Sequence, residues 1–238
     1  MALPELAKLG ILMLDTRFPR IVGDVGNAQT WPFPVKFAVV PGATPEAVVC
    51  DDTAPFVQAF VKAGRSLIAE GCTGIATTCG FLGLIRPQLT KDLGVPVATS
   101  ALEQAALVQA TLPPGEVVGI MTISAATLTD AHLKAAGVPD GCPVQGTDGS
   151  SFSRTILRNE PKLDVAAARS DMVLSAKELV ARTPRVGAIL LECTNMVPYA
   201  AAVAAASGRP VYSIYTYLTW FHASLTPPLF DASLFDED

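Results

Sequence analysis

Histidine is rare in this chain: there are two among 238 residues, and charged residues make up only 16% of the sequence. A metal site built from histidines is therefore not expected, and no two cysteines have the C-x-x-C spacing of a zinc site. Lysine and arginine number 17 against 22 aspartates and glutamates, a formal net charge of −5. This balance argues against the basic surface that a nucleic-acid-binding protein needs.

Long apolar runs are missing as well. No segment reaches the roughly 18 consecutive apolar residues of a membrane span, so no membrane-spanning helix is predicted. Residues 1–5 lack the charged and then apolar pattern of a signal peptide, and the five widely spaced cysteines do not suggest a disulfide framework. We therefore expect a cytoplasmic protein with reduced thiols.

Apolar segments alternate with helical segments along the chain, and half of its residues are hydrophobic, which is enough for a sizeable core. We expect strands at residues 8–14, 74–78, 95–99, 117–123, 186–191 and 211–215. We expect helices at residues 55–70, 100–111, 124–137, 164–180 and 195–207. This alternation predicts parallel sheets with helices on both faces.

The pattern restarts after the chain break at Pro113-Pro114-Gly115. Cys79 is followed 15 residues later by Gly94-Val95-Pro96-Val97, and Cys193 is followed 15 residues later by Gly208-Arg209-Pro210-Val211. Each cysteine ends an apolar strand that follows a long helix, so we infer two copies of one α/β unit. The first domain would comprise residues 1–112 and 217–238, and the second residues 113–216.

The position of Cys79 and Cys193 favours chemistry, because open α/β sheets bind ligands at the carboxyl ends of their strands. The free N–H groups and partial positive charge at the start of a following helix would lower the thiol pKa and could bind a carboxylate. Two opposed thiols can exchange a proton at carbon, since one removes it as thiolate and the other returns one. We expect Cys79 and Cys193 to be this catalytic pair, although buried free cysteines are also common in protein cores.

Small polar and charged residues near these strand ends are candidates for substrate binding. Their hydroxyl and amide groups can donate hydrogen bonds to a carboxylate, or to the enediolate that forms when an α-proton leaves. Arg17 could pair with a carboxylate or be solvated, and Asn27 lies in a Gly-Asn turn. The candidates are Thr78, Gly80, Thr194, Asn195, Ser124, Thr122, Asn27, Asp15 and Arg17. Cys72 is expected to be structural, and no role is assigned to Cys50 or Cys142.

Three segments of the sequence resemble the aspartate/glutamate/hydantoin racemase superfamily. They are Thr77-Thr78-Cys79, Glu192-Cys193-Thr194-Asn195, and the opening strand with its loop, Gly10–Arg17. The resemblance covers nearly the whole chain. It implies two pseudo-symmetric, flavodoxin-like α/β domains, each a parallel sheet flanked by helices, with the active site in the cleft between them. It also implies that no metal, pyridoxal phosphate or other cofactor takes part.

Two departures from relatives in this superfamily bear on the substrate. Glutamate racemases typically have Asn-Thr after the first cysteine and Thr-His after the second, but this chain has Gly80-Phe81 and Thr194-Asn195. The groups that hold an amino acid in those enzymes are thus partly missing. Arylmalonate decarboxylases resemble a one-cysteine arrangement with glycine in place of the first, and the retained Cys79 argues against that activity.

We therefore expect an isomerase, namely a racemase or epimerase that exchanges the α-proton of a small carboxylate, an amino acid of the aspartate or glutamate type, or a hydantoin. Two alternatives stay open: a maleate-type cis–trans isomerase with a cysteine nucleophile, and a non-catalytic small-anion binding protein. The expected partner is a small-molecule carboxylate, and a homodimer or higher homo-oligomer is compatible with the sequence.

Overall fold

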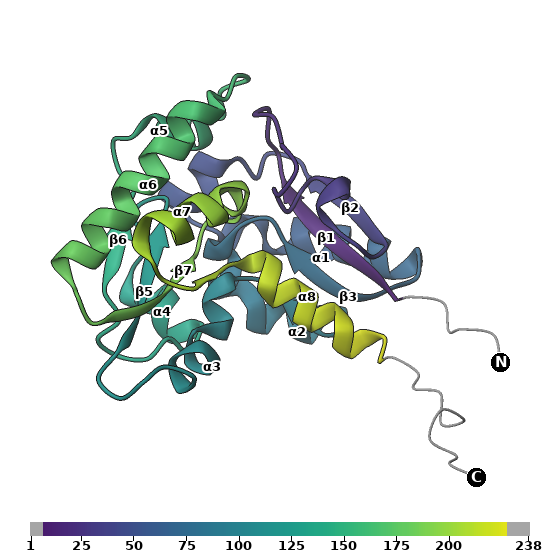
Figure 1. The fold of residues 1–238 in the computed structure, drawn as a ribbon. Helices are drawn as coiled ribbons and strands as arrows, with labels where there is room; N and C mark the ends of the chain where they lie inside the picture. The colour runs from purple at the N-terminus through teal and green to yellow at the C-terminus, as the bar shows by residue number, and fades with distance from the viewer. Residues whose placement is uncertain (1–6, 228–238) are drawn as a thin grey trace, which may run out of the picture.

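Two four-stranded parallel sheets form the framework of this protein, in a computed structural model that describes residues 7–227 (Figure 1). The strand order is β2-β1-β3-β4 in the first sheet and β6-β5-β7-β8 in the second. The same order thus occurs in both halves, and the predicted α/β fold with two pseudo-symmetric units is confirmed. Within the described residues, no helix has the length and apolar character to cross a membrane.

The first half contains four strands and the helices that flank them. Its strands are β1 (Lys8–Leu14), β2 (Val35–Val40), β3 (Cys72–Thr77) and β4 (Val97–Ala98). Its α-helices are α1 (Val57–Ala69), α2 (Arg86–Leu93) and α3 (Ala105–Ala110). Shorter helical turns are η1 (Ala28–Thr30), η2 (Ala47–Asp51), η3 (Ala54–Phe56), η4 (Gly80–Ile85) and η5 (Ala101–Gln104).

The second half repeats this arrangement and ends in one additional helix. Its strands are β5 (Val117–Thr122), β6 (Val144–Gly146), β7 (Val186–Leu191) and β8 (Val211–Tyr212). Its helices are α4 (Asp130–Ala135), α5 (Ser151–Leu157), α6 (Val165–Arg182), η6 (Thr194–Tyr199), α7 (Ala200–Ser207) and α8 (Ile214–Leu225).

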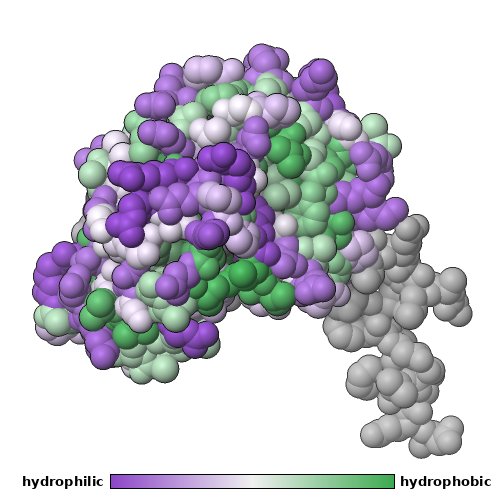
Figure 2. Space-filling model, turned by 90° about the horizontal axis from the view of Figure 1, so that it is seen from above, coloured by the Kyte–Doolittle hydropathy of each residue, from purple (hydrophilic) through white to green (hydrophobic). Residues whose placement is uncertain are grey.

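The cores lie between the sheets and their helices. Every residue of β7 is buried, as is typical of a parallel strand covered by helices on both faces. The edge strand β2 is instead mostly half-buried. Seen from above, much of the surface is hydrophilic, with smaller hydrophobic areas between (Figure 2).

The two copies agree residue for residue around the cysteines. Cys79 is the N-cap of η4, and the six residues of η4 and eight of α2 lead to Gly94, whose φ is 67°. Cys193 is the N-cap of η6, and the six residues of η6 and eight of α7 lead to Gly208, whose φ is 65°. Both glycines end a helix in the left-handed region that residues with a Cβ rarely adopt. Each cysteine therefore lies just beyond the carboxyl end of the equivalent strand, β3 or β7.

Helix α8 returns from the second half to the first sheet (yellow in Figure 1). Phe221 and Leu225 pack over Gly74 of β3, so closely that a Cβ on this glycine would lie 2.6 Å from Leu225 Cδ1. The expected domain boundary between residues 216 and 217 falls inside this helix. Residues 228–238, which that expectation also includes, lie outside the described residues.

Two element boundaries differ from expectation because side chains cap helices there. The strand expected at 211–215 ends at Tyr212, since Ser213 starts α8 and its Oγ accepts a hydrogen bond from the Tyr215 N–H at 3.2 Å. The helix expected from Ser124 begins only at Asp130, with Thr129 as its N-cap.

Candidate functional site

Cys79 and Cys193 both line one small cavity between the two halves of the molecule. Each cysteine is 7% exposed. The cavity volume is about 20 Å³, which is room for about one water molecule. The two pseudo-equivalent thiols therefore meet at a single closed site, and a larger ligand needs the walls to move apart.

Backbone N–H groups at the start of η4 and η6 reach the thiols, as the sequence predicts. The N–H groups of Phe81 and Leu82 act to lower the pKa of Cys79, and the N–H of Asn195 acts to lower that of Cys193. Burial outweighs them, however, and raises the pKa of Cys79 to about 12, with the negative charge of Glu192 contributing in the same direction. Burial and Glu192 also raise the pKa of Cys193 well above its usual value. The expected lowering of the thiol pKa is therefore wrong for this closed cavity, because desolvation of a thiolate costs more than a few N–H groups return.

Glu192 is the main site residue that the sequence analysis missed. It is 1% exposed and lines the cavity next to Cys193. Its Oε2 accepts a hydrogen bond from Thr122 Oγ1 at 2.8 Å, whereas its Oε1 is buried and has no hydrogen-bond partner among the described residues. Burial raises the pKa of Glu192 to about 7, against the lowering effect of the Thr122 hydrogen bond. A signal was present in the sequence: this charged residue directly follows the six buried apolar residues of β7.

Gly80 makes room for this carboxyl group. A Cβ on Gly80 would overlap Glu192 Oε1, and it would lie 3.1 Å from Glu192 Cδ and 3.0 Å from Ser100 Oγ. The need for glycine here is steric, since Gly80 is not among the glycines with positive φ. The absence of a side chain at Gly80, which follows Cys79, thus allows Glu192, which precedes Cys193, to pack against it.

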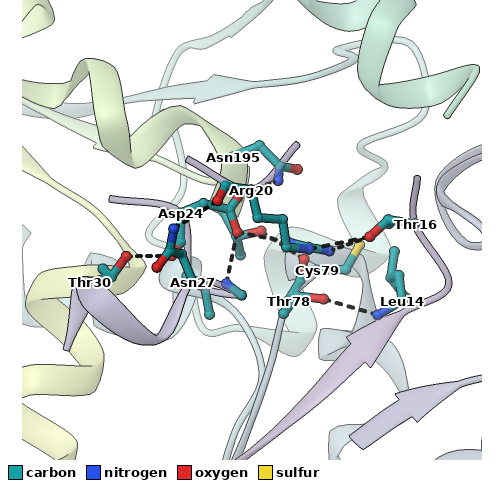
Figure 3. A network of polar contacts seen from close by, with 12 residues as sticks. Leu14, Thr16, Arg20, Asp24, Asn27, Thr30, Thr78, Cys79 and Asn195 are labelled. Carbon is teal, nitrogen blue, oxygen red and sulfur yellow. Dashed lines mark hydrogen bonds and ion pairs between the residues drawn. The ribbon is translucent and has the colours of Figure 1, made fainter. Parts of the chain in front are cut away.

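Arg20 brings the positive charge of the site, from the loop between β1 and β2 (Figure 3). Its Nη1 is 2.7 Å from Asp24 Oδ1, its Nη2 donates to Thr16 Oγ1 at 3.1 Å, and its guanidinium lies 5.1 Å from the centre of the Phe18 ring. Asp24 Oδ2 in turn accepts a hydrogen bond from Asn195 Nδ2 at 2.6 Å. The loop of the first half is thereby tied to η6 of the second, and Arg20 and Glu192 are the charged residues of the cavity lining.

Four of the predicted substrate-binding residues line the cavity: Thr78, Gly80, Thr194 and Asn195. Two of them join the halves, because Thr194 Oγ1 donates to the Thr78 carbonyl oxygen at 2.7 Å. Thr78 Oγ1 accepts a hydrogen bond from the Leu14 N–H at 3.1 Å, which fixes the end of β1 (Figure 3). These polar groups are already engaged within the protein.

The other predicted binding residues lie outside the cavity lining. Thr122 acts behind it, by holding Glu192. Ser124 Oγ donates to Asp148 Oδ1 at 2.7 Å, and Asn27 supports the loop, since its Nδ2 donates to the Arg20 carbonyl oxygen at 2.8 Å (Figure 3).

Asp15 and Arg17 line a separate surface pocket together with Asn159. Asp15 Oδ2 accepts a hydrogen bond from the Gly42 N–H at 3.0 Å. The structure therefore brings Arg20, and not Arg17, to the cysteines.

Comparison with known proteins gives two groups of relatives, while no family model matches the chain. The chain is 30% identical over 240 residues to "Dimethylsulfoniopropionate lyase 7" of Emiliania huxleyi, with 93% of this chain and 68% of the relative covered. It is 28% identical over 214 residues to "Dimethylsulfoniopropionate lyase" of Durusdinium sp. clade D, with 87% of this chain and 71% of the relative covered. These sequence relatives are enzymes that are named lyases.

Solved structures with the same fold come from the superfamily that the sequence resembles. Allantoin racemase from Pseudomonas fluorescens has a TM-score of 0.59 at 20% identity and covers 91% of this chain and 90% of its own. Glutamate racemase from Bacillus anthracis has a TM-score of 0.61 at 12% identity, with 96% and 85% covered. Unliganded arylmalonate decarboxylase has a TM-score of 0.57 at 16% identity, with 94% of each chain covered. At these identities the likeness shows the fold, which is the fold that the predicted superfamily implies.

Proposed function

Since the chain belongs to the family of the dimethylsulfoniopropionate lyases, we propose that it is a cofactor-independent lyase for dimethylsulfoniopropionate or a close analogue. In this reaction a cysteine removes the proton next to the substrate carboxylate, and a group is lost from the neighbouring carbon. The observation that carries the proposal is the pair of thiols, Cys79 and Cys193, in one cavity between the pseudo-symmetric halves.

The proposed elimination needs one base and a good leaving group. A cysteine thiolate takes the α-proton, and the electron pair of the C–H bond forms the double bond between the α- and β-carbons. The bond from the β-carbon to sulfur breaks, and its electron pair leaves with the sulfur. The products are acrylate, dimethyl sulfide and one proton, which the thiol later releases to solvent. A racemase shares the first step and differs in returning a proton to the same carbon.

Arg20 is the group we assign to the substrate carboxylate. Its guanidinium lines the cavity and is held by Asp24 and Thr16, and a guanidinium can donate several hydrogen bonds at once. The hydroxyl of Thr194 and the amide of Asn195 already serve Thr78 and Asp24. They are therefore better suited to hold the two halves together than to hold the substrate directly.

The closed cavity accounts for the weak acidity of the thiols. With a Cys79 pKa of about 12, almost no thiolate is present near neutral pH. A sulfonium cation next to the cysteines favours the charged thiolate and lowers its pKa by charge attraction. The substrate thus helps to form the base that attacks it, and a thiolate of high intrinsic basicity suits a weak carbon acid.

Racemisation is the second candidate, and the presence of two cysteines favours it. Elimination requires one base, whereas exchange of a proton between two faces of a carbon uses a base and an acid on opposite sides. The equivalent placement of Cys79 and Cys193 at the ends of β3 and β7 matches that requirement.

The test is to incubate the protein with dimethylsulfoniopropionate, aspartate, glutamate and a hydantoin in heavy water. Dimethyl sulfide is measured in the headspace, acrylate by chromatography, and deuterium at the α-carbon by NMR. We expect acrylate and dimethyl sulfide in equal amounts, unchanged by a metal chelator. Deuterium exchange with inversion of an amino acid or hydantoin, and no acrylate, would establish the racemase instead.

Variants assign the thiols in the same assay. Cys79→Ser and Cys193→Ser should each lower the rate, by roughly 100-fold or more for the cysteine that acts as base. Cys50→Ser is the matched control, since Cys50 is exposed and lies outside the cavity lining. Turnover that survives in both cavity variants would discard the mechanism, and binding without any turnover would leave a small-anion binding protein.

A further inference from the structure

The cavity contains an ionisable carboxyl group, that of Glu192, which no cation among the described residues pairs with. Glu192 is 1% exposed, and its Oε1 is buried without a hydrogen-bond partner among the described residues. A buried carboxylate is normally paired with a cation or fully hydrogen-bonded, because its desolvation is costly. Within residues 7–227, the Glu192 carboxyl group accepts one hydrogen bond, from the neutral hydroxyl group of Thr122.

The charged and titratable groups around Glu192 do not supply the missing cation. Cys79 and Cys193 face it from η4 and η6, and its charge raises the pKa of both thiols. Arg20 lines the same cavity, but its charge is paired with Asp24 at 2.7 Å. A positively charged ligand group that enters the cavity would therefore pair with the ionised carboxylate of Glu192.

We propose that the carboxylate of Glu192 binds the positively charged group of the substrate, so that the site selects small zwitterions whose cation lies a short distance from their carboxylate. The proposal rests on the proposed function, which requires a small carboxylate in this cavity. It adds a specificity-determining residue, Glu192, which recognises the cation of that substrate.

The chemical character of the remaining cavity walls suits such a zwitterion once the walls move apart. Arg20 and Glu192 are its charged lining residues, one for each end of a dipolar molecule. Between them the lining is largely apolar, with Leu14, Phe18, Val49, Phe81, Ile123 and Ile156. Apolar surroundings strengthen the attraction between opposite charges and accept the methyl groups of an onium ion. The missing Cβ of Gly80 leaves the room that Glu192 Oε1 occupies at the cavity wall.

The test compares two ligands of the same shape that differ in charge. N,N-dimethyl-β-alanine carries a protonated nitrogen where dimethylsulfoniopropionate carries sulfur, and 4-methylpentanoate has a neutral carbon at that position. Calorimetric titration at pH 8 measures the affinity of each for the wild-type protein. We expect the cationic ligand to bind at least about tenfold more tightly than the neutral one.

Glu192→Gln should remove this preference, bringing the ratio of the two affinities to about one, while the affinity for 4-methylpentanoate stays within about threefold. Glu192→Asp keeps the charge and should retain part of the preference. If Glu192→Gln does not fold, the Glu192→Asp protein is measured in its place. Glu178→Gln is the control, because Glu178 is exposed on α6, and should behave as wild type.

The pH dependence gives a second measure. The preference of the wild-type protein for the cation should increase as the pH rises through about 7, where Glu192 ionises, and it should be constant in Glu192→Gln. Equal affinity of the wild-type protein for both ligands would overturn the inference. A Glu192→Gln protein that keeps the preference for the cation would overturn it as well. If that variant also loses turnover, the role of Glu192 is in proton transfer and not in binding the cation.

These outcomes separate the inference from the proposed function. If the cation preference depends on Glu192 but dimethylsulfoniopropionate is not cleaved, the zwitterion site stands and the lyase assignment fails. If dimethylsulfoniopropionate is cleaved and no preference depends on Glu192, the lyase assignment stands and the inference fails.

Discussion

Gly80→Ala adds one methyl group at the most constrained point of the site. The new Cβ would overlap Glu192 Oε1 and would lie 3.0 Å from Ser100 Oγ. The Glu192 carboxyl cannot simply swing away, because Thr122 Oγ1 holds its other oxygen at 2.8 Å and the cavity beside it measures only about 20 Å³. Relief of the overlap therefore requires a backbone shift or the loss of the Thr122 hydrogen bond.

The expected cost follows from these two routes. Overpacking a buried site by one methyl group costs about 1–3 kcal/mol, and a broken buried hydrogen bond adds about 1 kcal/mol. We therefore expect Gly80→Ala to lower the free energy of unfolding by about 2–4 kcal/mol. In a protein of this size this is a fall of roughly 5–15 °C in melting temperature, measured by calorimetry. The rate of the proposed elimination should fall as well, because Glu192 would be displaced.

Gly83→Ala is the matched control within the same helix, η4. A Cβ at Gly83 would meet Ser100 Cβ at 3.7 Å and Thr99 Oγ1 at 3.9 Å, which are ordinary contacts. Its stability should therefore change by less than about 1 kcal/mol. In a Glu192→Ala background, the cost of Gly80→Ala should fall by more than half, since the main overlap is gone. Equal melting temperatures for the two alanine variants would refute the close packing of Glu192 on Gly80.

Two further predictions concern titration of the buried groups. Iodoacetamide at pH 8 should modify exposed Cys50 in the folded protein and reach Cys79 and Cys193 only after unfolding, because both are 7% exposed and burial raises the pKa of each. Peptide mass spectrometry measures the order in which the cysteines are modified, and equal rates of modification would contradict this prediction. In the folded protein the pKa of Glu192 is raised from 4.5 to about 7. Protonated Glu192 therefore adds about 3 kcal/mol to the free energy of unfolding below pH 4.5, and this contribution is lost as the pH rises through about 7. The wild-type protein should therefore lose stability relative to Glu192→Gln between pH 5 and pH 8 in urea unfolding, and parallel profiles would exclude a buried, titrating Glu192.

The central strands could be predicted from the sequence because hydrophobic runs determine them. The expected strands at 8–14 and 186–191 match β1 and β7 at both ends, since a strand buried on both faces is a continuous apolar run. The Ser100 capping box is also confirmed, with Glu103 accepting from the Ser100 N–H. Signals of this kind are local and survive in any tertiary context.

Elements whose stability depends on neighbours were missed. β2 and β6 are edge strands of largely half-buried residues. β6 is only three residues long and α2 contains few apolar positions, so their local signals are weak. Their backbone hydrogen bonds to β1 and β5 hold the edge strands in place, and this pairing is not visible in a local window of sequence.

The candidate site shows the same division between local and distant information. The spacing of 15 residues from each cysteine to the glycine that ends the following helix lies within one copy, and it identifies the two thiols that line the cavity. The importance of Glu192 depends on Gly80, more than a hundred positions earlier in the chain, and that pairing exists only once the two halves are packed. Arg17 is among the residues named from the sequence, and Arg20 is not. Both residues follow β1, and the path of the loop determines which one enters the cavity.

The duplicated unit has been modified at the two positions that flank each cysteine. Thr78 and Glu192 are equivalent in the register of the copies, as are Gly80 and Thr194. The halves meet through these unlike pairs: Thr194 Oγ1 donates to the Thr78 carbonyl oxygen at 2.7 Å, and Glu192 occupies the space above Gly80. Thr194→Val should therefore cost about 1–3 kcal/mol in urea unfolding, because a buried carbonyl loses its donor. Thr127→Val should cost much less, because the Thr127 hydroxyl has no hydrogen-bond partner in the part of the chain that the structure describes. Equal costs would mean that the contact between Thr194 and Thr78 does not couple the halves.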